Sequence, residues 1–144
     1  MKPSYTELSR IDRADALMQI AEVMAQRSTC SRAHVGVVIA REGRILVTGY
    51  NGAPKGLPHC NHELSGQTEG CRTAVHAEAN AIAFAAREGI QLDPCEVYTT
   101  FTPCLACAQL LINVGVTRIY VKNKYRLAEG QALLEAAGID IIYV

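Results

Sequence analysis

Four residues with metal-binding or proton-transfer chemistry lie in two short clusters. His76 and Glu78 are two residues apart, and Cys104 and Cys107 are three apart behind Pro103. One imidazole and two thiols are ligand types that zinc takes, and three protein ligands leave the fourth position for water, as in catalytic zinc sites. The sequence therefore predicts a catalytic zinc site at His76, Cys104 and Cys107.

Both clusters are expected at the starts of helices. Cys104 and Cys107 then point to the same side of one helix. Thr102 is expected to be the N-cap of that helix and Pro103 its first residue, which leaves the sulfurs near free N–H groups and the positive end of the helix dipole. Both effects favour thiolate, the form that binds metal.

Glu78 is the candidate general acid and base, because a carboxylate beside a metal-bound water can take its proton and pass it to a substrate. Positions two apart on a helix differ by about 200° in direction, so His76 and Glu78 converge only at the helix opening. Taken singly, each group has another explanation. The two cysteines could form a redox motif or a structural zinc site. Glu78 could simply stabilise the helix dipole from the first turn, and His76 could be a capping or buried histidine. Their conjunction favours the catalytic site.

Composition limits the kind of protein. The chain has 144 residues, 49% hydrophobic and 19% charged, with a formal net charge of zero. This suits one domain over residues 1–144 with a single core, and favours neither disorder nor binding to a nucleic acid polymer. No apolar run is long enough to span a bilayer and no secretory segment is evident, so a cytoplasmic location without membrane attachment is expected.

Periodicity predicts an α/β fold. An amphipathic helix over 14–27, with Leu17, Ile20, Ala21 and Met24 on its apolar face, precedes a hairpin of strands 35–40 and 44–50 turning at Gly43. Helices and strands then alternate: helices at about 77–89, 105–114 and 128–137, strands at 97–101, 118–121 and 139–144. This order predicts a three-layer α/β/α fold with a five-stranded mixed sheet: an antiparallel hairpin, then parallel strands, with helices on both faces.

The spacing His-x-Glu followed by Pro-Cys-x-x-Cys resembles the signature of the zinc-dependent nucleoside, nucleotide and nucleobase deaminases. The resemblance implies a cytidine-deaminase-like fold and a hydrolase in which His76, Cys104 and Cys107 bind zinc. Glu78 would shuttle the proton while ammonia leaves and a carbonyl replaces it.

Three further segments are similar to the deoxycytidylate deaminases: Gly49 to Pro54, His76 to Ile82, and Asn123-Lys124-Tyr125. The similarity runs from about Ala25 to the last residue. It implies conversion of dCMP to dUMP for thymidylate synthesis.

That resemblance also implies substrate contacts. Asn51 would hold the sugar, Thr102 and the Ala77 backbone would meet the base, and Tyr125 would lie near the nucleotide. The alternatives are a tight turn at Asn51-Gly52 and a partly buried aromatic side chain at Tyr125.

Members of that family are typically homo-hexamers, activated by dCTP and inhibited by dTTP, which bind with magnesium at subunit interfaces. The matching positions are Arg27, Ser28, Gly49, Tyr50, Gly52, Asn80 and Arg87. Arg87 could equally be a solvated residue at a helix end.

A second, structural zinc site is the hypothesis for Cys30, Cys60 and Cys71, with His59 or His62 as a fourth ligand. Some family members carry such an ion, and it would keep ordered the Gly- and Pro-rich loop over 51–72, which is too long for a plain connector. Cys95 is expected to be a small buried residue instead.

Alternative functions stay open. A sister deaminase could act on cytidine or deoxycytidine, or on adenosine in transfer RNA, although a folded RNA would require a basic surface. A zinc-stabilised nucleotide sensor without catalysis would have no need of Glu78.

Overall fold

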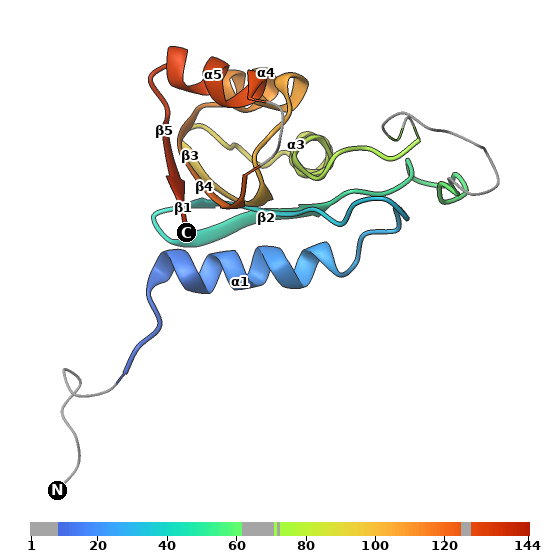
Figure 1. Ribbon diagram of the computed structural model, residues 1–144, viewed down its shortest axis with the longest axis horizontal. Coiled ribbons are helices and arrows are strands. Elements are labelled where there is room, and N and C mark those ends of the chain that lie inside the picture. The colour runs from blue at the N-terminus through green and yellow to red at the C-terminus, as the bar shows by residue number, and fades with distance from the viewer. Residues whose placement is uncertain (1–8, 62–70, 72, 125–127) are drawn as a thin grey trace, which may run out of the picture.

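The computed structural model describes residues 9–61, 71, 73–124 and 128–144. It contains four helices and five strands in these ranges (Figure 1): α1 (Arg13–Ala25), β1 (Gly36–Arg41), β2 (Arg44–Tyr50), α3 (Ala77–Glu88), β3 (Cys95–Phe101), α4 (Leu105–Asn113), β4 (Val116–Asn123), α5 (Glu129–Ala136) and β5 (Asp140–Tyr143). Each expected element is present, with boundaries that differ by a few residues. Within the described part of the chain, no helix has the length and apolar character needed to cross a bilayer.

The strands form one mixed sheet in the order β2-β1-β3-β4-β5. Strand β1 is antiparallel to both β2 and β3, whereas β3, β4 and β5 are parallel to one another. At the hairpin turn Glu42 and Gly43 have positive φ angles of 53° and 77°. This is the backbone that a two-residue turn with the twist of the flanking strands requires. The predicted five-stranded mixed sheet is confirmed.

Helices cover both faces of the sheet, as expected. Helix α1 lies on one face and helices α3, α4 and α5 lie on the other (Figure 1). The larger core cluster joins β1, β3 and β4 to the three later helices through residues such as Ile39, Ala81 and Leu111. A smaller cluster packs Leu17 and Met18 of α1 on the opposite face. The molecule therefore has the three-layer α/β/α architecture.

The predicted apolar face of α1 is partly wrong. The buried residues are Leu17, Met18, Ala21 and Ala25, whereas Ile20 keeps 37% of its surface exposed. Apolar residues occur around much of this helix, so periodicity alone does not fix its rotation. The small side chains of Ala21 and Ala25 let the helix approach the sheet closely, and they take the inner positions instead of the larger isoleucine.

Candidate active site

The three predicted zinc ligands meet at the starts of two helices on the same face of the sheet. His76 is the N-cap of α3 and Cys104 is the N-cap of α4, one turn before Cys107. The expectation that Thr102 caps α4 and that Pro103 is its first residue is wrong. The Thr102 N–H donates to the Asn123 carbonyl at 3.1 Å, which continues the pairing of β3 with β4 and delays the helix until Leu105.

The ligand atoms have the spacing that a small ion requires. The Nδ1 atom of His76 lies 3.3 Å from the Cys104 sulfur and 3.4 Å from the Cys107 sulfur. All three ligand atoms lie within 4.8 Å of one another. A tetrahedral zinc with ordinary bond lengths would separate nitrogen and sulfur by about 3.6 Å. The donor types and distances therefore fit zinc with little rearrangement.

The electrostatics of the cluster also favour a cation. Hydrogen bonds from Cys107 and then from His76 lower the pKa of the Cys104 thiol to about 4. The hydrogen bond with Cys104 in turn raises the pKa of His76. A thiolate is thus available at neutral pH, in the form that binds metal. The N–H groups at the start of α4 add to this stabilisation.

Glu78 lies in the first turn of α3, beside this cluster. Its side chain is buried, with 4% of the residue exposed, and burial raises the pKa of its carboxyl group. The Thr99 hydroxyl oxygen lies 3.4 Å from Glu78 Oε1. His76 and Glu78 converge because His76 is the capping residue, outside the regular helix. A buried carboxyl group beside this candidate metal site has the placement of a proton-transfer group.

Sequence reasoning missed two residues around this site. Thr99 reads simply as a strand residue, since threonine is common in strands. Asn123 entered only through the family resemblance, yet its side-chain amide donates to the Thr100 carbonyl at 2.9 Å while its own carbonyl accepts from Thr102. Asn123 therefore holds the chain between β3 and Cys104 in place.

Asn51, predicted to contact the sugar, is buried and bonded to the backbone of the segment before β1. Its Oδ1 accepts from Val35 N–H at 2.8 Å and its Nδ2 donates to the Ala33 carbonyl at 2.7 Å. An amide of this kind keeps one further hydrogen and one lone pair. Asn51-Gly52 forms no tight turn, because Gly52 pairs with Val75 in an isolated antiparallel bridge.

Of the three other residues predicted to contact the substrate, the structure describes two. Ala77 and Thr102 are buried next to the ligands, and the Thr102 hydroxyl lies 3.4 Å from the Tyr143 hydroxyl. Tyr125 lies outside the described residues.

Most of the predicted effector residues meet where α1, β2 and α3 come together. The Arg27 guanidinium lies 6.0 Å from the centroid of the Tyr50 ring. Asn80 donates its side-chain amide to the Tyr50 carbonyl at 2.9 Å. Gly49 and Gly52 flank Tyr50 and are buried, and the Ser28 hydroxyl donates to the Ala33 carbonyl.

Arg87 is not part of this group. It lies about 10 Å from Asn80 along the axis of α3. Its guanidinium stacks 5.0 Å from the Phe84 ring centroid and pairs with Glu88. These contacts are those of a solvated residue at a helix end.

The structure brings Cys30, Cys60 and Cys71 together as a second cluster, with all three sulfurs within 4.8 Å of one another. The Ala74 N–H donates to the Cys71 sulfur at 3.3 Å. Burial raises the pKa of Cys30, but hydrogen bonds from the backbone of Arg32 and Ala33 outweigh it and the pKa is lowered. Backbone N–H donors to sulfur stabilise thiolates, so this cluster also fits a metal.

Of the two histidines expected as a fourth ligand of that cluster, His59 lies among the described residues. His59 is exposed and does not belong to the cluster as described. His62 lies outside the described residues. Cys95 is buried apart from both clusters, as expected, and burial raises the pKa of its thiol to about 11.

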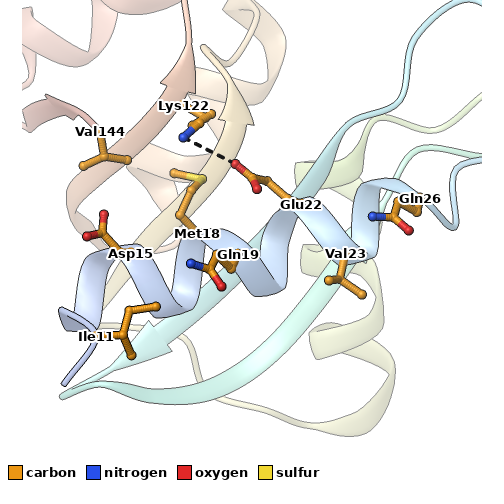
Figure 2. Close-up of a pocket in the computed structure, with 9 residues that line it drawn as sticks. All are labelled: Ile11, Asp15, Met18, Gln19, Glu22, Val23, Gln26, Lys122 and Val144. Atoms are coloured by element: carbon orange, nitrogen blue, oxygen red, sulfur yellow. Dashed lines mark ion pairs between the residues drawn. The ribbon is translucent and has the colours of Figure 1, made fainter. Parts of the chain in front are cut away.

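A groove of about 510 Å³ lies on the α1 side of the molecule (Figure 2). The Lys122 ammonium group pairs with Glu22 across it at 3.7 Å. Its lining residues are Ile11, Asp15, Met18, Gln19, Glu22, Val23, Gln26, Lys122 and Val144. They include none of the predicted site residues, so the groove is separate from the candidate active site.

Zinc-dependent deaminases of nucleosides and nucleotides place one histidine, two cysteines and a nearby glutamate on an α/β/α scaffold, and the chain has each of these features. The family model for the cytidine and deoxycytidylate deaminase zinc-binding region matches residues 11–123. The chain therefore belongs to the cytidine and deoxycytidylate deaminase family.

Individual relatives agree with this assignment. The chain is 39% identical over 124 residues to the deoxycytidylate deaminase of Mycobacterium phage D29, covering 78% of this chain and 95% of the relative. It is 34% identical over 136 residues to ComE operon protein 2 of Bacillus subtilis, and the match covers 93% of this chain and 72% of the relative. The dCMP deaminase of cyanophage S-TIM5, solved with dCMP and dUMP, superposes with a TM-score of 0.85 at 30% identity. The superposition covers 95% of this chain and 100% of the cyanophage chain.

Proposed function

We propose that this protein is a dCMP deaminase, which hydrolyses dCMP to dUMP and ammonia and so supplies the precursor of thymidylate. The observation that carries the proposal is the meeting of His76, Cys104, Cys107 and buried Glu78 at two helix N-termini. The similarity to a dCMP deaminase solved with both dCMP and dUMP supports the choice of substrate.

The roles follow from the placement of the side chains. His76, Cys104 and Cys107 would hold the zinc ion, which when bound would supply the Lewis acidity that makes water nucleophilic at neutral pH. Glu78 takes one proton from the attacking water and passes it to the ring nitrogen, and then takes the second proton, from the added hydroxyl, and passes it to the leaving amino group. The water oxygen bonds to the amino-bearing ring carbon, the carbon–nitrogen bond breaks, and nitrogen leaves as ammonia.

Substrate binding is assigned to the residues around the ligands. Asn51 contacts the sugar through the hydrogen and lone pair that its backbone bonds leave over. Thr102 and the Ala77 backbone contact the base, because Ala77 follows His76 directly and Thr102 lies two residues before Cys104. Tyr125, which lies outside the described residues, is assigned to the nucleotide by the family resemblance alone.

The test follows the loss of cytosine absorbance with dCMP, deoxycytidine, cytidine and dCTP in parallel, with zinc measured in the same preparation. A kcat/KM for dCMP at least tenfold above the others is expected. Preference for a nucleoside would reject the substrate assignment. No turnover of any of the four by a zinc-loaded preparation would reject it as well.

We further propose that Cys30, Cys60 and Cys71 bind a second, structural zinc. The sulfur spacing and the N–H donors to Cys30 and Cys71 support this. Either His59 or His62 would complete a closed site.

We propose regulation by dCTP as activator and dTTP as inhibitor, each bound with Mg²⁺, at Arg27, Ser28, Tyr50 and Asn80. The support is that Asn80 links Tyr50 to α3, the helix whose N-cap is His76. A ligand there would act directly on the active-site helix. The rate at subsaturating dCMP should rise with dCTP and fall with dTTP. An unchanged rate with either triphosphate in Mg²⁺ buffer would reject the regulation and leave the deaminase assignment intact.

A homo-hexamer is the proposed assembly. Large apolar side chains exposed on α1 and α4, including Val23, Leu105 and Leu110, support burial of these surfaces between copies. Sedimentation velocity of the purified protein should give a mass of about six chains, and a monomer at micromolar concentration would contradict this.

A further inference from the structure

Thr99 lies in the middle of β3 and is completely buried. Its backbone pairs with Val37 on one side and with Val121 on the other. A residue fixed by two neighbouring strands has little freedom to move. Its hydroxyl is therefore a rigid group on the sheet face that carries α3 and α4.

The Thr99 hydroxyl has two acceptors within reach. Its oxygen lies 3.0 Å from the Phe101 carbonyl oxygen and 3.4 Å from Glu78 Oε1. A hydroxyl has one hydrogen and two lone pairs, so it donates to one of these two acceptors at a time, and it can accept from Glu78 only when that carboxyl group is protonated.

We infer that Thr99 is the positioning residue for Glu78, which it holds by Oε1 so that the other carboxyl oxygen is directed to the reacting atoms. The inference rests on the proposed deaminase function. The present 3.4 Å separation is long, but catalytic hydrogen bonds are commonly long without ligand and shorten in the substrate complex.

A hydroxyl is well suited to this position because Glu78 is alternately a carboxylate and a carboxylic acid during turnover. Toward the carboxylate, Thr99 donates its hydrogen. Toward the acid, the hydrogen turns to the Phe101 carbonyl and the Thr99 oxygen accepts. The Glu78 side chain keeps one partner, and therefore one orientation, through both halves of the reaction.

Thr99→Val tests this, because valine has nearly the same shape and lacks the hydroxyl. We expect kcat for dCMP to fall about 10- to 100-fold, the effect of losing a hydrogen bond to a charged group. Zinc content and the Kd of dUMP should stay at wild-type values. Thr99→Ser, which restores the hydroxyl, should recover most of kcat.

The matched control is Thr100→Val. Thr100 is the next residue of β3, is also buried, and its hydroxyl accepts from the Gly36 N–H at 3.1 Å instead of contacting Glu78. It should leave kcat within about twofold of wild type, since only stability depends on that bond.

The outcomes separate the two proposals. Wild type without dCMP turnover rejects the function itself. Active wild type together with an unchanged kcat in T99V, or equal losses in T99V and T99S, overturns the role of Thr99. If T99V does not fold, Thr99→Ala replaces it, and a crystal structure showing an unmoved Glu78 carboxylate would also overturn the inference.

Discussion

Glu78 carries the proton transfer in the proposed reaction, and it does so from a buried position that is unfavourable for a carboxylate. A buried carboxylate loses its hydration, and burial accordingly raises the pKa of this group. The same environment excludes bulk water from the proton that the residue is to transfer. Glu78 lies in the first turn of α3, and its carboxyl group is hydrogen-bonded to the Cys107 thiol.

Glu78→Gln keeps the shape of the side chain and removes the proton acceptor. We expect kcat to fall by about 10²- to 10⁴-fold, the usual contribution of a general acid or base. Zinc content and dUMP affinity should be retained. Glu88→Gln, at the exposed end of the same helix, is the control and should have no effect on kcat. Wild-type turnover by the Glu78→Gln variant would refute the role of Glu78.

Cys95 gives a prediction about pH. Burial raises the pKa of its thiol from 9.0 to about 11, so between these pH values the unfolded chain releases a proton that the folded chain keeps. The stabilisation is present below pH 9 and is lost as the pH rises to 11, by about 2–3 kcal/mol. Urea unfolding at about pH 8 and about pH 10.5 should show this loss in wild type and a smaller loss in Cys95→Ala. Parallel pH profiles would contradict the assignment.

At this scale the metal ligands could be predicted because their chemistry is carried by residue type and spacing. Thr99 could not, since nothing in its local sequence separates a hydroxyl that contacts Glu78 from one that merely suits a strand. Thr99 and Glu78 are brought together only by packing of α3 on the sheet.

The start of α4 shows how sheet pairing decides an element boundary. Thr102-Pro103 is a good helix-opening sequence, but the bond from Thr102 to Asn123 keeps this segment extended. Cys104 then becomes the capping residue and Cys107 lies one turn further. Both sulfurs still lie beside His76 Nδ1, at 3.3 and 3.4 Å, so the cluster was predictable although the cap was not.

The elements themselves were predictable because each carries a strong pattern. The rotation of α1 was not, because its sequence has apolar residues on more than one side. Ala21 and Ala25 are inside because of their small size next to the sheet, which is a property of the partner surface and not of the helix.

Gly49→Ala tests the contact between β2 and α3. A methyl group at this position would overlap the Ala77 carbonyl and touch Ala81, so α3 would have to shift at the turn that holds His76 and Glu78. We expect a loss of about 1–3 kcal/mol in the free energy of unfolding, the usual cost of overpacking. Urea denaturation measures this. Stability and zinc content equal to wild type would show that α3 tolerates the displacement.

At the scale of the whole molecule, the two cysteine clusters are connected through neighbouring residues of the chain. Cys71 precedes His76 by five residues, and Val75 between them pairs with Gly52 through hydrogen bonds of 2.7 and 3.2 Å. A metal at Cys30, Cys60 and Cys71 would thus anchor the segment that enters α3. The spacing of these cysteines in the sequence could not establish the cluster, because they are far apart along the chain and only the fold brings them together.

Cys60→Ser tests whether the two clusters have separate roles, one structural and one catalytic. Wild type is expected to hold two zinc ions per chain and the variant one. Since a bound structural ion stabilises only the folded state, the Tm should fall by about 5 °C or more, and the loop should become sensitive to limited proteolysis. Some kcat should persist, because His76, Cys104 and Cys107 are intact.

The complementary variant, Cys104→Ser, should lose the other ion and all measurable turnover while the loop keeps its resistance to protease. Cys95→Ala is the control for removing a buried cysteine outside both clusters, and it should keep two zinc ions. One zinc per chain in wild type, unchanged by Cys60→Ser, would show that the second cluster binds no metal. The long loop would then depend on protein contacts alone.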